Sequence, residues 1–131
     1  MKRFEFEVPL YKYKIIVILM KSIKDKDLVL KEASKLNLNE DHIAELTKML
    51  EQDSYDGANI YYHRGKLKIF IVMFPHSSVE SLLGTIIHEG RHATDEVVEA
   101  CNIEGREAPA YLNEDICVKI IKEFIKIKEK G

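Results

Sequence analysis

The sequence predicts an α+β fold, in which a small, largely antiparallel sheet is packed by two helices from the C-terminal half of the chain. Three observations predict this class. Apolar residues alternate or run together through the first twenty positions, two apolar runs flank Arg64-Gly65, and apolar residues recur at helical spacing after residue 77. Strands that come first and helices that come last are typical of α+β domains.

The composition is that of one folded domain spanning residues 1–131. The chain is 46% hydrophobic and 32% charged, with only 6 glycines and 3 prolines, which excludes collagen-like and disordered classes. No internal repeat, low-complexity tract or linker-like run divides it.

The charge balance argues against polyanionic partners. Lysine and arginine total 20 against 22 acidic residues, so a net charge of −2 supplies no field for nucleic acid or an anionic membrane. The apolar run 15–20 is too short to span a bilayer, and nothing in the sequence resembles a secretory signal. Cys101 and Cys117 can form at most one disulfide, and we expect both to be reduced and mostly buried. A cytoplasmic protein is expected.

The elements follow in order along the chain. Two strands are predicted in the first twenty residues, on either side of Pro9. Residues 27–36 and 39–51 predict consecutive helices, the second capped by Asn39. Residues 59–62 and 66–73 predict a hairpin, whose second strand suits the centre of a sheet or an edge that faces a substrate.

Two longer helices complete the domain. Ser77-Ser78-Val79-Glu80 has the pattern of a capping box and predicts a helix that runs to about Cys101. The last helix is predicted to begin between Glu107 and Pro109, because proline is tolerated in a first turn whose N–H groups have no intrahelical partner. Its lysine-rich end suits the negative helix terminus.

The chemically informative motif is His88-Glu89-Gly90-Arg91-His92, an HExxH pattern. Residues four apart on a helix lie one turn above each other, so the two imidazoles can bind one Zn²⁺. Glu89 can then reach the water at the metal without being a ligand. Both histidines are expected on the face opposite the apolar stripe of their helix, which argues against core histidines but allows solvated polar ones.

A catalytic zinc site needs a third protein ligand beside an open position. Glu107 and Glu114 are seven residues apart and so lie on one side of the last helix, beside an apolar face. That predicted face consists of Ala110, Cys117, Ile121 and Phe124. Asp95, Glu96 and Glu99 are further candidates, although the first two lie about a turn beyond His92. We expect Asp95 to orient an imidazole or to pair with Arg91.

The stretch from His88 to Asp95, followed by Glu107-Ala108-Pro109-Ala110-Tyr111-Leu112, resembles the zincin metallopeptidases of the Glu-liganded type. It is most similar to small metallopeptidases encoded by phages and prophages, in which HExxHA is followed by an E-A-x-A-Y-L segment. The resemblance covers about a fifth of the chain. It implies His88, His92 and Glu107 as zinc ligands and Glu89 as general base.

Other polar aromatic residues carry weaker expectations. Tyr111 lies one turn after Glu107 and could donate its hydroxyl to an oxyanion, although packing is the more common role of a tyrosine. The remaining histidines are expected at the surface and the remaining tyrosines in packing or in the hairpin. These are His42, His63 and His76, and Tyr55, Tyr61 and Tyr62.

The resulting functional hypothesis is a zinc-dependent peptidase acting on a peptide or protein, with the strand 66–73 lining the cleft and pairing with the substrate. The main alternative is a zincin-like binding or accessory protein without catalysis, possessing the same fold. A helix-turn-helix DNA reader over residues 27–51 is disfavoured, because its second helix begins with Glu40 and Asp41.

Overall fold

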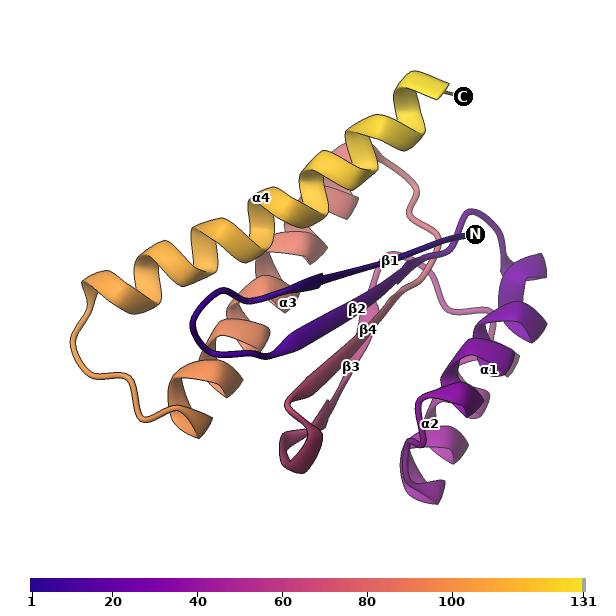
Figure 1. Cartoon of the computed structure of the whole chain (residues 1–131). Helices are drawn as coiled ribbons and strands as arrows, with labels where there is room; N and C mark the ends of the chain where they lie inside the picture. Colours follow the sequence, from indigo (N-terminus) through magenta and orange to yellow (C-terminus); the bar gives the residue numbers. More distant parts are fainter. Residues whose placement is uncertain (131) are drawn as a thin grey trace.

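The computed structural model describes residues 1–130, the last three by backbone alone. It confirms the α+β class (Figure 1). The strands are β1 (Lys2–Glu7), β2 (Lys14–Leu19), β3 (Ala58–His63) and β4 (Lys68–Met73). The helices are α1 (Lys26–Lys35), α2 (Glu40–Glu51), α3 (Val79–Ala100) and α4 (Glu107–Lys130), with short 3-10 turns at Ile23–Asp25 and Arg64–Lys66.

The sheet is mixed, with strand order β1-β2-β4-β3. The two outer pairs are antiparallel, but the central pair β2 and β4 is parallel, with Lys14 opposite Lys68 and Leu19 opposite Met73. A parallel pair requires a crossover connection, which α1, α2 and β3 supply here. Of the two places predicted for the strand 66–73, the centre of the sheet is confirmed, because β4 is paired on both sides. The expectation that a substrate pairs with this strand is wrong, since β3 is the edge strand of this half of the sheet.

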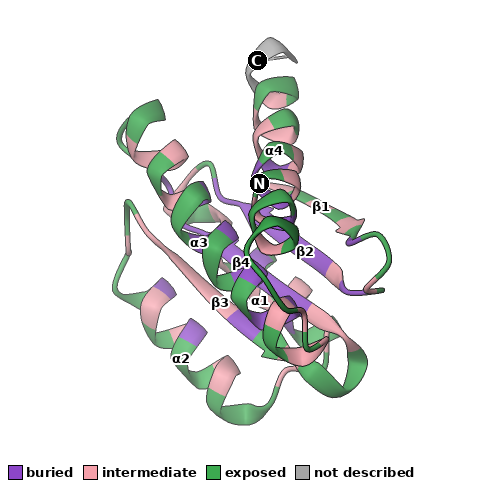
Figure 2. Cartoon of the chain, turned by 90° about the vertical axis from the view of Figure 1, so that its left-hand side faces the viewer, coloured by how far each residue is buried: buried purple, intermediate pink, exposed green. Residues whose placement is uncertain are grey.

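Helices cover both faces of the sheet, so the domain has three layers (Figures 1 and 2). Along β2, Ile15 and Val17 face the core shared with α3 and α4, whereas Ile16 and Ile18 face the core shared with α1 and α2. A strand buried on both faces is expected to read as a continuous apolar run, which is the pattern of residues 15–20.

The helix starts follow the predicted capping chemistry with one shift. Asn39 caps α2 by accepting the His42 N–H through its side chain at 2.8 Å. The cap of α3 is Ser78, which accepts the Ser81 N–H at 3.0 Å. The predicted box from Ser77 to Glu80 is therefore wrong, because the cap lies one residue later and Ser81 holds the third helical position. Ser77 instead donates from its backbone and its hydroxyl to Asp56, which ties the loop before β3 to the start of α3.

α4 packs along α3 through a close approach at Gly90. A Cβ built on Gly90 would collide with Cys117 Sγ, and Thr94 donates its hydroxyl hydrogen bond to Asn113 at 3.2 Å. The buried face of α4 is formed by Leu112, Ile116, Cys117 and Ile120. Of the predicted apolar face, Cys117, Ile121 and Phe124 pack in or against this core, whereas Ala110 is exposed.

Both cysteines are free thiols, Cys117 buried and Cys101 half-buried. Among the described residues, no helix combines the length and the apolarity that crossing a bilayer requires.

Candidate metal centre

His88 and His92 project from the side of α3 that faces away from α4. Taking about 100° of rotation per residue, each lies about 160° around the helix from Gly90, the point of contact with α4. Both are exposed, as expected for histidines off the apolar stripe. Their Nε2 atoms are 3.1 Å apart, and their ring centroids are 4.7 Å apart at an interplanar angle of 75°.

The separation of the two Nε2 atoms suits a common metal ion. Two nitrogens bound to a tetrahedral Zn²⁺ at about 2.05 Å lie about 3.3 Å apart. The observed 3.1 Å is close to that value. Without a metal, the same distance allows one neutral imidazole to donate its N–H to the other. The pair can therefore pass from a hydrogen bond to metal coordination with little movement.

Glu89 lies beside the pair and is buried, with an exposed fraction of 6%. Its Oε1 is 3.9 Å from His88 Nε2. Its Oε2 is the one buried side-chain oxygen or nitrogen among the described residues without a hydrogen-bond partner. Burial raises the pKa of this carboxyl, and the neighbouring imidazoles of His92 and His88 oppose the shift. An unpartnered buried carboxylate is costly, and a cation or a water held at the histidines would relieve that cost.

His88, Glu89 and His92 form the one group of three His, Cys, Asp or Glu side chains, among the residues described, whose donor atoms all lie within 4.8 Å of one another. Two imidazoles with one carboxylate are a donor set that zinc and several other divalent ions accept. The residues present therefore fit a metal ion.

The structure does not bring Glu107 to this group. It is exposed at the first turn of α4. Asn113, six residues further along α4, lies against Thr94. That register places Glu107 about 9 Å back from Asn113 toward the start of α4, beside the C-terminal end of α3. Glu114 is also exposed, so neither carboxylate borders a buried face as the sequence argument required.

The other acidic candidates have different partners. Asp95 accepts a hydrogen bond from Arg91 Nε at 3.0 Å, which confirms the predicted pair. Glu99 is exposed and lies 3.7 Å from Arg64 Nη2. Tyr111, 67% exposed, lies on α4 and thus on the far side of α3 from the histidines.

Glu96 has a structural environment that the sequence did not reveal. It accepts the Tyr13 hydroxyl at 2.8 Å and two hydrogen bonds from Arg64, at 2.7 and 3.2 Å. Arg64 holds the pKa of this carboxyl below its usual range, and burial together with Glu96 raises the pKa of Tyr13. Because Tyr13 precedes β2 and Arg64 lies in the hairpin turn, Glu96 fastens α3 to the sheet one turn beyond His92.

Tyr62, predicted to pack or to lie in the hairpin, is a second residue whose surroundings the sequence did not reveal. It lies on the edge strand β3, where Ile60, two positions earlier, packs into the core on the α3 side. Burial raises the pKa of Tyr62 to about 12, and the nearby carboxylates of Glu89, Glu96 and Asp95 add to the shift. The alternation of a strand could have predicted that adjacent tyrosines face opposite layers, but not which layer carries the histidines.

The remaining histidines and tyrosines lie apart from the cluster. His76 contacts the Phe74 carbonyl through Nδ1 at 2.6 Å and Thr85 Oγ1 through Nε2 at 2.8 Å. His42 packs on Tyr61, with ring centroids 5.0 Å apart, and Tyr61 packs on Phe70 as expected. His42, His63 and His76 are half-buried rather than fully at the surface, whereas Tyr55 is exposed.

Comparison with protein-family models, with curated proteins and with solved structures finds no match to this chain. The residues of the cluster and their geometry are therefore what a functional proposal rests on.

Proposed function

We propose that the protein is a zinc-dependent peptidase of the zincin type, in which His88 and His92 hold the metal and Glu89 is the general base. The observation that carries this proposal is the unpartnered, buried Oε2 of Glu89 beside two imidazoles whose Nε2 atoms lie at a metal-sharing distance. A bound zinc ion supplies a Lewis acid for the carbonyl of a peptide bond.

The roles of the protein groups follow from their positions. The two histidines come from consecutive turns of one rigid helix, so their separation is fixed before any metal binds. Burial raises the pKa of Glu89, which suits a group that takes a proton from water and returns it to the leaving amine. Exposure of His88 and His92 leaves the other side of the metal open to water and substrate.

Metal analysis tests the site directly. Purified wild-type protein is dialysed against zinc and then against metal-free buffer, and bound zinc is measured by atomic absorption. We expect stoichiometric zinc in the wild type and loss in His88→Ala and His92→Ala. The matched control is His76→Ala, whose ring contacts a carbonyl and Thr85 away from the cluster. Equal zinc in all four proteins would refute the site.

Glu89→Gln separates chemistry from metal binding. The amide keeps the shape of the side chain but is too weak a base to accept a proton from water. We expect Glu89→Gln to retain zinc while losing hydrolysis of unstructured peptides by at least a hundredfold. Loss of zinc in this variant would instead make Glu89 a ligand, in a site of two histidines and one carboxylate.

A binding or accessory role without catalysis is the second candidate, and the position of Glu107 favours it. With Glu107 at the start of α4, the described residues supply no carboxylate other than Glu89 to the two histidines. Such a protein would hold zinc without cleaving any peptide, and its biological effect would survive Glu89→Gln.

A further inference from the structure

A second concave site lies at the carboxyl ends of the two central strands, away from the histidine cluster. The helices that follow β2 cover one face of the sheet, and the helix that follows β4 covers the other. The chain therefore diverges between these two parallel strands just beyond Met20 and Phe74, which are still linked by the Met20 N–H to the Met73 carbonyl at 3.0 Å. In open sheets of parallel strands, such a divergence is where ligands bind.

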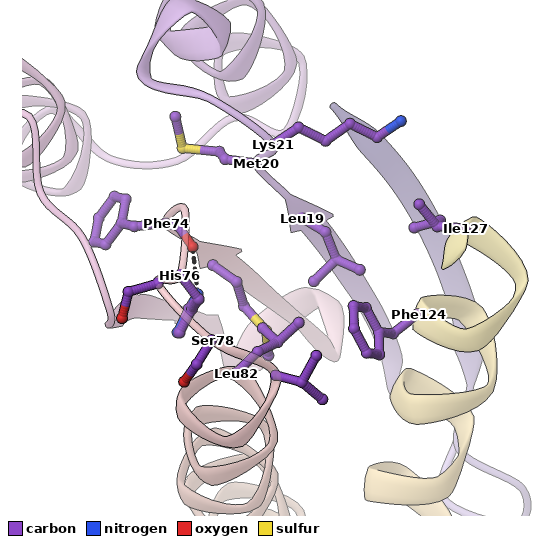
Figure 3. Close-up of a pocket in the computed structure, with 12 residues that line it drawn as sticks. Leu19, Met20, Lys21, Phe74, His76, Ser78, Leu82, Phe124 and Ile127 are labelled. Carbon is purple, nitrogen blue, oxygen red and sulfur yellow. Dashed lines mark hydrogen bonds between the residues drawn. The ribbon is translucent and has the colours of Figure 1, made fainter. Parts of the chain in front are cut away.

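A cavity of about 600 Å³ opens at this point. Its walls come from β2, β4, α3 and α4, and Figure 3 shows Leu19, Leu82 and Phe124 directed toward one another from three of these elements. Most of the lining side chains are apolar. The size and the apolar lining are those of pockets that enclose small organic molecules.

The polar groups of the cavity define which molecule it suits. His76 is engaged at both ring nitrogens by Phe74 and Thr85. Among the described residues that line the cavity, Lys21 is the one lysine, arginine, aspartate or glutamate. Its exposed ammonium has no ion-pair partner in the part of the chain that the structure describes.

Two acidic groups near the cavity have partners within the chain. Asp25 accepts the backbone N–H groups of Lys21 and Ser22 and pairs with the N-terminal ammonium at 3.3 Å. Asp56, beside the start of α3, accepts three hydrogen bonds from Ser77 and Ser81. Among the described residues, the one charged side chain that lines the cavity is thus a cation, although the chain as a whole is acidic.

We propose that this cavity binds a small amphipathic carboxylate, with its apolar chain between β2, β4, α3 and α4 and its carboxylate at Lys21. The site is independent of the proposed zinc centre, since it shares no residue with it. A regulatory or carried ligand of this chemistry would contact the N-terminal part of α3 three turns before His92.

Methionine methyl signals report on binding without any substitution. The chain has 4 methionines, of which Met20 and Met73 line the cavity and Met1 and Met49 do not. Protein labelled with ¹³C at the methionine methyls is titrated with sodium decanoate, below the concentration at which decanoate forms micelles. We expect saturable shifts of Met20 and Met73 and constant signals from Met1 and Met49. No shift, or equal shifts of all four, would overturn the proposal.

A pair of tryptophan reporters checks the location. The chain has no tryptophan, and Val79 and Val118 are matched valines, 39% and 40% exposed on α3 and α4. Only Val79 lines the cavity. Decanoate should shift the indole emission of Val79→Trp to shorter wavelength and leave that of Val118→Trp unchanged. A response of both variants would indicate non-specific adsorption and contradict the site.

The charge preference is tested with decanol and with lysine variants. Decanoate should bind wild type more tightly than Lys21→Gln by about two- to fivefold, the range of a solvent-exposed ion pair. Decanol should bind both equally, and Lys24→Gln, an exposed lysine outside the cavity, should match wild type. Binding of decanol alone would overturn the carboxylate assignment. So would binding only to phosphatidylglycerol vesicles, which would indicate a lipid surface.

Discussion

Glu89 and Glu96 lie two turns apart on the same helix and are both buried, at 6% and 9% exposed, yet their surroundings are opposite. Glu96 is held by Tyr13 and Arg64, and its pKa is lowered. Glu89 has one oxygen without any partner, and its pKa is raised. A carboxylate that stabilises a fold is expected to look like Glu96. The environment of Glu89 is instead typical of residues in catalytic or binding sites.

The first prediction concerns Glu107, the ligand that the zincin resemblance implies. Because Glu107 is exposed and α4 packs on the opposite side of α3 from the histidines, Glu107→Gln should leave zinc affinity unchanged. His92→Gln is the positive control and should lose zinc. The measurement is competition for zinc with a chromogenic chelator. A tenfold or greater loss of affinity in Glu107→Gln would show that the start of α4 reaches the metal and that the register described above is wrong.

At this scale the sequence predicted that His88 and His92 lie together, but not what surrounds them. The spacing of His88 and His92 is a local property of one helix, so it could be read directly. A third ligand depends on how the next helix packs, and the close approach at Gly90 sets that packing. The environments of Glu96 and Tyr62 were not predicted, because they join α3 to distant parts of the sequence. Tyr13 precedes β2, Arg64 lies in the hairpin turn and Tyr62 lies on the edge strand.

Among the elements, the contact between α3 and α4 depends on the missing side chain of Gly90. A Cβ there would collide with Cys117 Sγ, whereas a Cβ on Gly84 of the same helix would meet nothing within 4 Å. Gly90→Ala should therefore lower the free energy of unfolding by about 1–3 kcal/mol. Gly84→Ala should raise it by about 0.5–1 kcal/mol, through helix propensity alone. Urea denaturation followed by circular dichroism measures both.

A double variant separates this collision from other effects of the alanine. Removing the sulfur in Gly90→Ala/Cys117→Ala should recover most of the stability lost by Gly90→Ala, relative to Cys117→Ala alone. Strict additivity of the two substitutions would mean that α3 and α4 do not meet at these residues.

The ion pair of Glu96 with Arg64, which joins α3 to the sheet, predicts that the free energy of unfolding depends on pH. Arg64 holds the pKa of Glu96 below 4.5, so the ionised carboxylate contributes stability above pH 4.5 that is lost as the pH falls through the lower folded-state value. Glu96→Gln should lower the free energy of unfolding by about 1.5–3 kcal/mol at pH 7, the contribution of hydrogen bonds to a charged group. The difference from wild type should shrink below pH 4.5 in urea titrations.

Glu99→Gln is the matched control, because Glu99 is a neighbour of the same arginine but its side chain is 76% exposed. It should change stability by less than about 0.5 kcal/mol at either pH. A deficit of Glu96→Gln that stayed constant from pH 7 to pH 3 would mean that the ionised carboxylate is not what fastens the helix.

Most elements could be predicted from local patterns, whereas their pairing could not. Alternation, capping residues and turn residues are local, and they placed every strand and helix to within a few residues. Which strands become neighbours is a tertiary property. The run 15–20 contained the missing signal, because a strand that is apolar at every position is buried on both faces, as parallel central strands are.

The whole molecule consists of two helical layers that share one sheet. β2 and β4 contribute alternate residues to both cores (Figure 2). If one helical layer lost its packing, the face of these strands that it covers would be exposed to water, and the strands that support the other layer would be weakened. The group His88, Glu89 and His92 lies on α3 in one layer, while Leu46 is fully buried in the core of the opposite one. The domain is therefore expected to unfold as one cooperative unit, with metal binding and distant packing contributing to the same transition.

Leu46→Ala tests this coupling. Loss of a fully buried leucine should lower the free energy of unfolding by about 2–5 kcal/mol. Zinc at a hundredfold excess over its dissociation constant should stabilise wild type and Leu46→Ala by the same increment of about 2.7 kcal/mol, because the ligand binds the folded state of each. The increment should vanish in His88→Ala. Urea unfolding is followed by circular dichroism and by tyrosine fluorescence. If the two probes gave separate transitions, with zinc moving only one of them, the layers would unfold independently and the shared sheet would not couple them.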